Sequence, residues 1–122
     1  MNILVNKIAS ILSEIKSNVI NAFLFRIYNR RRPVKEIWKA GEEFRDKIWY
    51  DLHLYSVKNG EFDDGMVPED IRKNAFKTAE EILNKFGEEE LGPYDDFEAG
   101  ILWGKLLALR WVLGADWDFC DI

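Results

Sequence analysis

The sequence predicts an all-α protein, a compact bundle of about four helices. Apolar residues recur at spacings of three and four through most of the 122 residues, which is the period of the α-helix. Turn residues and prolines divide this pattern into stretches, and none of them shows the strict alternation of a half-buried strand. The helices are expected at roughly 3–29, 34–57, 68–86 and 96–113.

The composition is that of an ordinary globular protein of one domain. Apolar residues make up 48% and charged residues 32% of the chain, close to the average for soluble domains. A chain of 122 residues can build a single core without metal or disulfide support. The single cysteine, Cys120, cannot form an internal disulfide and suits a reducing compartment. We therefore expect one helical domain over 1–122, in the cytoplasm and without a signal peptide.

Charge is distributed unevenly along the chain, although the net charge is only −5. Residues 1–60 hold 11 basic and 6 acidic side chains, hence +5, whereas residues 61–122 hold 6 and 16, hence −10. A uniformly basic nucleic-acid binder would not show this distribution. Opposite charges in the two halves favour contact between the halves or head-to-tail association of copies.

Residues 3–29 predict a long amphipathic helix with an apolar stripe on one side and mostly Asn and Ser on the other. We favour packing of the stripe in the core of its own bundle. Packing on a second copy ranks next, because about seven turns are generous for so small a domain. A helix lying in a membrane interface ranks third, because few lysines lie on the polar side. The stripe residues named as partner-binding candidates are Ile8, Ile15, Val19, Phe23 and Ile27.

A basic cluster follows this helix. Arg30, Arg31 and Arg32 precede Pro33, and the residue before a proline is biased away from the helical region. Such a cluster can bind phosphate, nucleic acid or another anionic surface. We favour a simpler interpretation, in which the cations stabilise the helix C-terminus and meet the acidic half of the chain. The three arginines are kept as partner-binding candidates.

Residues 34–57 and 68–86 predict two further helices, joined by the turn-rich loop KNGEFDDGMVP. Gly41 lies on the apolar stripe of the first of them, and we expect another helix to approach it closely. His53 is the only histidine in the sequence. Because no nucleophile or second ligand is identified beside it, we expect it at a boundary or at the surface.

Residues 96–113 predict a buried helix at the centre of the bundle. Apolar residues wrap almost its whole circumference, which is typical of a buried helix, and the run is shorter than a membrane span. Gly100, Gly104 and Ala108 recur every four residues along one side, where they would let another helix backbone approach. Four leucines form a second packing surface on the opposite side: Leu102, Leu106, Leu109 and Leu113.

The residues on either side of this helix mark its ends. Asp95 or Asp96 suits the N-cap, and Gly114 suits the position after the C-terminus. Trp117 and Phe119 follow, and we expect them to fold back as a plug under the bundle, because two exposed large aromatic side chains would be costly. If they are exposed instead, they are candidates for docking a partner.

The C-terminal stretch FEAGILWGKLLALRWVLGADWDF resembles a block found in small, uncharacterised prokaryotic proteins. That block reads approximately (F/W)E-x-G-x-L-x-G-K-L-x-A-L-R-W-V-L-G-x-x-W-D. The resemblance covers about the last quarter of the chain. It implies no activity, cofactor or catalytic residue, because none is established for such proteins.

Clustered carboxylates raise one enzymatic alternative, a magnesium-dependent nucleotide pyrophosphohydrolase. All-α enzymes of the MazG and dimeric dUTPase type hold magnesium with E-x-x-E on one helix and E-x-x-D on the next, and oxygen ligands suit this cation. Glu43 and Asp46 fit the second half of that pattern, but Lys39 follows Glu36 where the first half would need an acid. A further acidic group lies at the start of the last helix: Asp95, Asp96 and Glu98. We assign no catalytic, cofactor or metal residue, and magnesium enters only under this alternative.

The pattern as a whole indicates a small, non-enzymatic helical interaction or adaptor protein. We expect it to self-associate, most simply as a homodimer through the first helix, and to bind a protein partner that the sequence does not identify. No transmembrane segment is expected. A second alternative is a nucleic-acid-binding accessory protein that uses Arg30–Arg32, but nucleic acid is not the partner we favour.

Overall fold

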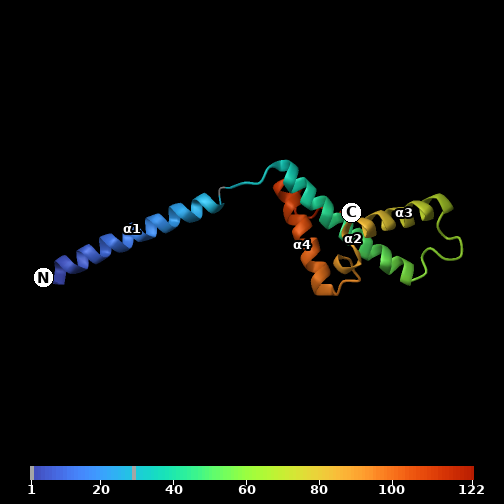
Figure 1. Cartoon of the computed structure of the whole chain (residues 1–122), viewed down its shortest axis with the longest axis horizontal. Coiled ribbons are helices and arrows are strands. Elements are labelled where there is room, and N and C mark those ends of the chain that lie inside the picture. The colour runs from blue at the N-terminus through green and yellow to red at the C-terminus, as the bar shows by residue number, and fades with distance from the viewer. Residues whose placement is uncertain (1, 29) are drawn as a thin grey trace. The chain divides into compact units, whose positions relative to one another are not determined.

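The computed structural model describes residues 2–28 and 30–122, with the side chains of Ile27 and Tyr28 left out. Four α-helices, α1 (Asn2–Tyr28), α2 (Val34–Lys58), α3 (Glu69–Phe86) and α4 (Asp96–Val112), are joined by loops and one 3-10 turn, η1 (Glu88–Glu90) (Figure 1). The described residues contain no strand. The all-α prediction with four helices is confirmed, and the helix ends lie within two residues of those expected.

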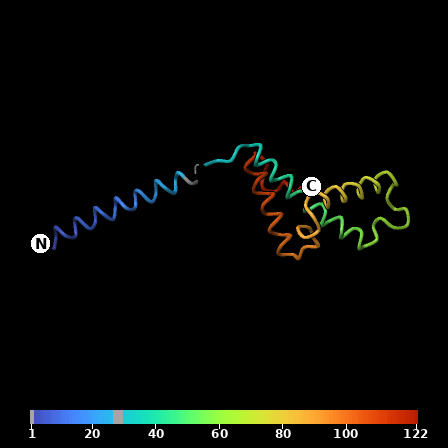
Figure 2. Tube along the Cα trace, viewed as in Figure 1, coloured from blue at the N-terminus to red at the C-terminus, as the bar shows by residue number. Residues whose placement is uncertain are grey.

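By its internal contacts the chain divides into two units, residues 1–33 and residues 34–122. The first unit contains α1 and the non-helical residues 30–33, and the Cα trace shows α1 as a long helix (Figure 2). All described side chains from Asn2 to Arg26 are exposed. The single domain predicted over 1–122 stays a prediction.

The second unit is a bundle organised around α2. α4 packs against the first half of α2, where Leu106 lies opposite Gly41. α3 packs against the second half, where the ring of Phe76 meets that of His53. η1 contacts α3 and returns the chain to α4. The described residues with the deepest burial are Ile48, His53, Ala79, Ile82, Leu91 and Leu106.

The N-terminus of α4 is fixed by a capping box, as the sequence indicated for Asp95. The backbone N–H of Glu98 donates to Asp95 Oδ1 over 2.7 Å, and the N–H of Asp95 donates to Glu98 Oε2 over 3.1 Å. Two backbone donors that the helix itself cannot satisfy are thereby paired. Gly114 follows the helix with a φ of 104°, a backbone conformation that residues with a side chain rarely adopt.

The expected burial of α4 holds for one face only. Leu106 is 1% exposed and packs toward α2, so the leucine face is the one that forms the core. The side with Gly100, Gly104 and Ala108 is exposed, and a Cβ at either glycine would meet no atom within 4 Å. The physical reason is the number of neighbours, because only α2 among the helices of this unit packs against α4.

The connection between η1 and α4 is held on α2 by a close backbone approach. The N–H of Tyr94 donates to Asp51 Oδ1 over 2.9 Å, and the Tyr94 hydroxyl donates to the carbonyl of Glu90 over 2.6 Å. A Cβ built at Gly92 would lie only 2.3 Å from Asp51 Oδ1. Gly92 is therefore the glycine that packing requires, whereas Gly41, expected to have that role, has only ordinary contact with Leu106 at 3.9 Å.

Candidate functional site

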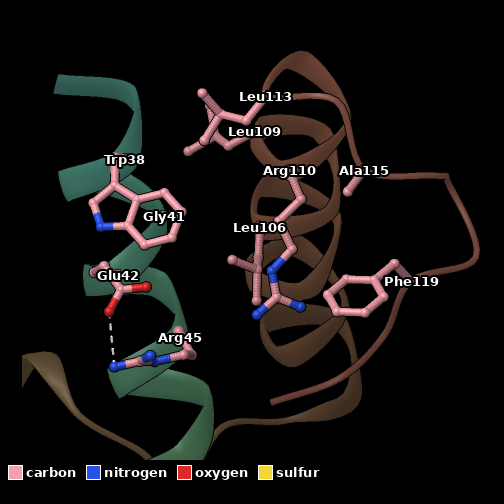
Figure 3. A pocket seen from close by; sticks show the side chains of 10 residues that line it. All are labelled: Trp38, Gly41, Glu42, Arg45, Leu106, Leu109, Arg110, Leu113, Ala115 and Phe119. Atoms are coloured by element: carbon pink, nitrogen blue, oxygen red, sulfur yellow. Dashed lines mark ion pairs between the residues drawn. The ribbon is translucent and has the colours of Figure 1, made fainter. Parts of the chain in front are cut away.

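An apolar cavity of about 320 Å³ lies between α2, α4 and the C-terminal tail. Leu106 and Leu109 of α4, and Leu113 directly after it, project toward Trp38 and Gly41 on α2 (Figure 3). These three leucines lie together because their spacing of three and four keeps them on one side of the helix and its C-terminal cap. The remaining lining residues are Glu42, Arg45, Arg110, Ala115 and Phe119.

Both arginines beside the cavity already have partners. Arg45 lies 2.8 Å from a carboxylate oxygen of Glu42 and 3.3 Å from one of Asp46. The Arg110 guanidinium lies over the Phe119 ring at 5.4 Å and donates to the backbone carbonyl of Asp121. Glu42 is the only carboxylate among the lining residues described. The cavity is therefore suited to an apolar group and offers no acid–base pair for catalysis.

The C-terminal tail folds back on α4, as expected, but it is not a core plug. The indole of Trp117 stacks on that of Trp111 with centroids 4.8 Å apart and planes inclined by 13°. Trp117 remains 55% exposed and Phe119 49% exposed. Trp117 stays exposed because it stacks on Trp111, which is itself half exposed, whereas Phe119 lines the cavity beneath the Arg110 guanidinium. Trp117 and Phe119 are therefore aromatic side chains at the surface.

The partner-binding candidates on α1 form an exposed apolar stripe. Ile8, Ile15, Val19 and Phe23 are each at least 50% exposed. Ile27 belongs to the same predicted stripe, but its side chain lies outside the described residues. Packing of this stripe on a core, the arrangement we favoured, is not found in the unit that α1 forms.

One described helix is long and apolar enough to cross a membrane, over Asn2–Arg26. Length and composition alone are weak grounds, because core helices and signal sequences meet the same criteria. Lys7, Glu14 and Lys16 lie inside this stretch, and a charged side chain near the centre of a span costs about 2.5–3.5 kcal/mol on insertion scales. The helix is not a clear transmembrane segment.

The basic cluster is exposed as well. Arg30, Arg31 and Arg32 lie in the non-helical stretch that follows α1, and Arg26 lies in the last turn of α1. The boundary between the two units follows directly, at Pro33. Lys35 and the residues after it therefore belong to the other unit.

The carboxylates that suggested magnesium chemistry do not come together. Asp46 lies 3.6 Å from the ammonium of Lys85 and also beside Arg45. The carboxylates of Asp95 and Glu98 instead accept hydrogen bonds from backbone N–H groups at the start of α4. Among the described residues, no group of three or more Asp, Glu, His or Cys side chains is placed to hold a metal. The geometry therefore gives the nucleotide-hydrolase alternative no support.

His53 was expected at a boundary or at the surface, and the structure buries it. It is 7% exposed and its ring stacks on Trp49 at 5.2 Å, with the rings of Phe62 and Phe76 at 5.4 and 5.1 Å. This burial lowers the pKa of the imidazole, because desolvation disfavours its charged form. The spacing of Trp49 and His53, four residues apart on one helix, is the signal that would have predicted their contact.

Tyr94 has a pKa raised above its ordinary value. Desolvation is the largest cause, and the nearby carboxylates of Asp51, Glu98 and Glu90 act in the same direction. The phenol therefore stays protonated and keeps donating to the Glu90 carbonyl. Its role in the described structure is to hold the connection before α4.

No family model, curated protein or solved structure matches this chain. The resemblance of its C-terminal block to small prokaryotic proteins therefore stays a prediction. What can be inferred about function comes from the surfaces and contacts described above.

Proposed function

We propose that this chain is a small, cytoplasmic helical interaction protein that self-associates, most simply as a homodimer, through the apolar stripe of α1. The observation that carries the proposal is the exposure of that stripe, with Ile8 at 50% and Val19 at 64%. Exposed apolar patches of this extent mark interaction sites in soluble proteins. The C-terminal aromatic side chains Trp117 and Phe119 are a separate surface available to a different protein partner.

The register of the apolar residues supports a second copy as the occupant. Val5, Ile8, Leu12, Ile15 and Val19 are spaced alternately by three and four residues. A spacing of 3.5 residues is that of a two-stranded coiled coil, in which each such side chain inserts between residues of the facing helix. None of these five positions carries a charge, so no like charges would meet where an identical helix packs on this row.

The magnitudes favour a dimer of moderate affinity. Burying a large apolar side chain fully contributes about 1.5–3 kcal/mol, and half-exposed side chains have roughly half of that left to gain. Six described residues of the stripe are in this state, so two copies gain on the order of 12 kcal/mol: Leu4, Ile8, Ile11, Ile15, Val19 and Phe23. Association costs roughly 4–15 kcal/mol in lost freedom. The balance fits a reversible dimer better than an obligate one.

The test compares two double variants that place the same charges on opposite sides of α1. Ile8→Asp with Ile15→Asp alters the stripe, whereas Ser10→Asp with Ser17→Asp alters the polar side. Sedimentation equilibrium of the full chain should give a dissociation constant at least tenfold weaker for the stripe variant and unchanged for the control. Equal weakening in both variants, or a wild-type chain that is monomeric throughout, would contradict the proposal.

A vesicle arm separates self-association from membrane binding. The same three proteins are sedimented with vesicles that contain anionic phospholipid, to which Arg26 and the basic cluster would be attracted. We expect the wild-type chain to remain in the supernatant as a dimer. If it is monomeric in solution and binds vesicles through the stripe, a membrane surface is the occupant and the proposal is wrong.

A further inference from the structure

α4 presents a continuous apolar face to solvent on the side away from α2. Its two large aromatic side chains stand at either end, with Phe97 76% exposed and Trp111 50% exposed. Ile101 and Val112 are exposed between and beside them at 42% and 58%. The α4 face consists of Phe97, Gly100, Ile101, Gly104, Ala108, Trp111 and Val112, all exposed and none charged. Trp117 stacks on Trp111 at the border of this face and is not counted as part of it.

No contact within residues 34–122 explains the glycines at the middle of this face. A glycine in a helix interior costs about 1 kcal/mol relative to alanine, and α4 carries two of them. A Cβ at Gly100 or Gly104 would meet no described atom within 4 Å. No neighbour within residues 34–122 therefore requires a missing side chain at either position. A helix from another molecule that approached between Phe97 and Trp111 would require the side chains at Gly100 and Gly104 to be missing.

The order of residues on the α4 face is nearly symmetric about Gly104. Phe97 and Trp111 lie seven residues to either side of it, and Gly100 and Ala108 lie four residues to either side. Two antiparallel copies of α4 crossing at Gly104 would thus place each Phe97 against the Trp111 of the other copy. Gly100 and Ala108 would face each other in the same way. A patch that meets itself across a two-fold axis must be self-complementary in this sense.

We propose that α4 forms an antiparallel, two-fold contact with α4 of a second copy, with Gly104 at the crossing point. This deepens the self-association proposed above and rests on it, because it names a second contact between copies. Small residues allow the two backbones to approach closely, and the aromatic ends supply apolar surface that leaves water. The leucine side of α4 stays in the core of its own chain.

The area available is in the range of a specific but reversible contact. Aromatic side chains contribute about 150–250 Å² each when buried, so the exposed parts of the α4 face amount to roughly 500 Å² per copy. Two copies would bury about 1,000 Å², slightly below the ~1,200 Å² at which stable interfaces begin. The α4 contact alone is therefore expected to be weak and to strengthen the contact made by α1.

Disulfide trapping tests the proposal, with the exposed native thiol removed by Cys120→Ser in every variant. Gly104→Cys should form a dimer crosslink with itself under mild oxidation. Gly100→Cys and Ala108→Cys should crosslink when mixed but not alone, because eight residues of helix separate like positions by about 12 Å, beyond the ~7 Å limit of a disulfide. Lys73→Cys, exposed on α3, is the control for random collision.

The same variants are repeated with Ile8→Asp and Ile15→Asp on α1, which separates the two contacts. Crosslinking at Gly104 that survives the α1 changes supports the α4 contact even if the α1 stripe fails its own test. If wild-type chains associate but Gly104→Cys crosslinks no faster than Lys73→Cys, the α4 proposal alone is wrong. If all three α4 positions crosslink with themselves, the helices are parallel and the two-fold antiparallel arrangement is overturned.

Discussion

At the scale of single residues, His53 gives the fold a dependence on pH. Burial lowers its pKa below the ordinary value of 6.5, so the folded chain binds fewer protons than the unfolded chain just below that pH. The free energy of unfolding should therefore be at its full value above about pH 6.5 and should fall as the pH decreases toward the lowered pKa. Urea unfolding at intervals from pH 7.5 to 5.5 measures this slope.

The control for this prediction is His53→Phe, which keeps an aromatic ring between Trp49 and Phe76 and removes the titrating group. Since the chain has one histidine, the variant should lose most of the slope in this range. An unchanged slope in the variant would show that another group carries the pH dependence.

Gly92 and Gly41 show how differently two glycines can matter. Gly92→Ala would place a Cβ 2.3 Å from Asp51 Oδ1 and 2.9 Å from the Tyr94 nitrogen, so the connection before α4 must shift. We expect a loss of about 1–3 kcal/mol in the free energy of unfolding, as for other overpacked sites. Gly41→Ala should instead be neutral or stabilise α2 by up to about 1 kcal/mol. Chemical denaturation of both variants makes the comparison, and equal effects would contradict it.

At the scale of helices, the ends were predictable and the buried faces were less so. Pro33, Gly87, Asp95 and Gly114 each act through local backbone chemistry, so they mark helix ends without reference to the rest of the fold. α4 is apolar nearly all round, so its periodicity could not indicate which side meets α2. The leucine side packs against α2 because its larger side chains bury more apolar surface there, and the small-residue side remains exposed.

The environment of His53 and the contacts of the tail needed the three-dimensional structure. The position of a single histidine in the sequence does not predict whether it is buried. The rings that surround His53 come from α2, α3 and the loop between them, and only the fold brings them together. The tail was expected to fold back, and it does so through Arg110, Trp111 and their ring contacts. How far it is buried depends on the number of neighbouring helices, which residue spacing does not report.

At the scale of the whole molecule, the apolar stripe of α1 illustrates a limit of pattern reading. Periodicity indicates that one side of a helix avoids water, but it does not identify what covers that side. Residues 1–33 form a unit of their own. Periodicity could not distinguish whether the stripe packs on its own bundle, on a second copy or on a membrane surface, and we favoured the first. The charge difference between the halves has the same character, because it favours association without naming the copy or protein involved.

Association should also appear as a dependence of thermal stability on protein concentration. A folded state that binds a second copy is stabilised by mass action, so the midpoint of thermal unfolding should rise as the chain is concentrated. The stripe variant Ile8→Asp with Ile15→Asp should show a smaller rise than the control Ser10→Asp with Ser17→Asp. Scanning calorimetry over a hundredfold range of concentration checks this, and a midpoint independent of concentration would exclude association of the folded chain.

The stacked indoles of Trp111 and Trp117 make the attachment of the tail optically visible. Two chromophores held 4.8 Å apart are close enough for their electronic transitions to couple, so the absorption and emission of the pair differ from those of two separate indoles. The unlabelled protein therefore carries its own reporter for the position of its last residues. A partner that lifted the tail from α4 would remove that coupling while leaving the helices of the chain in place.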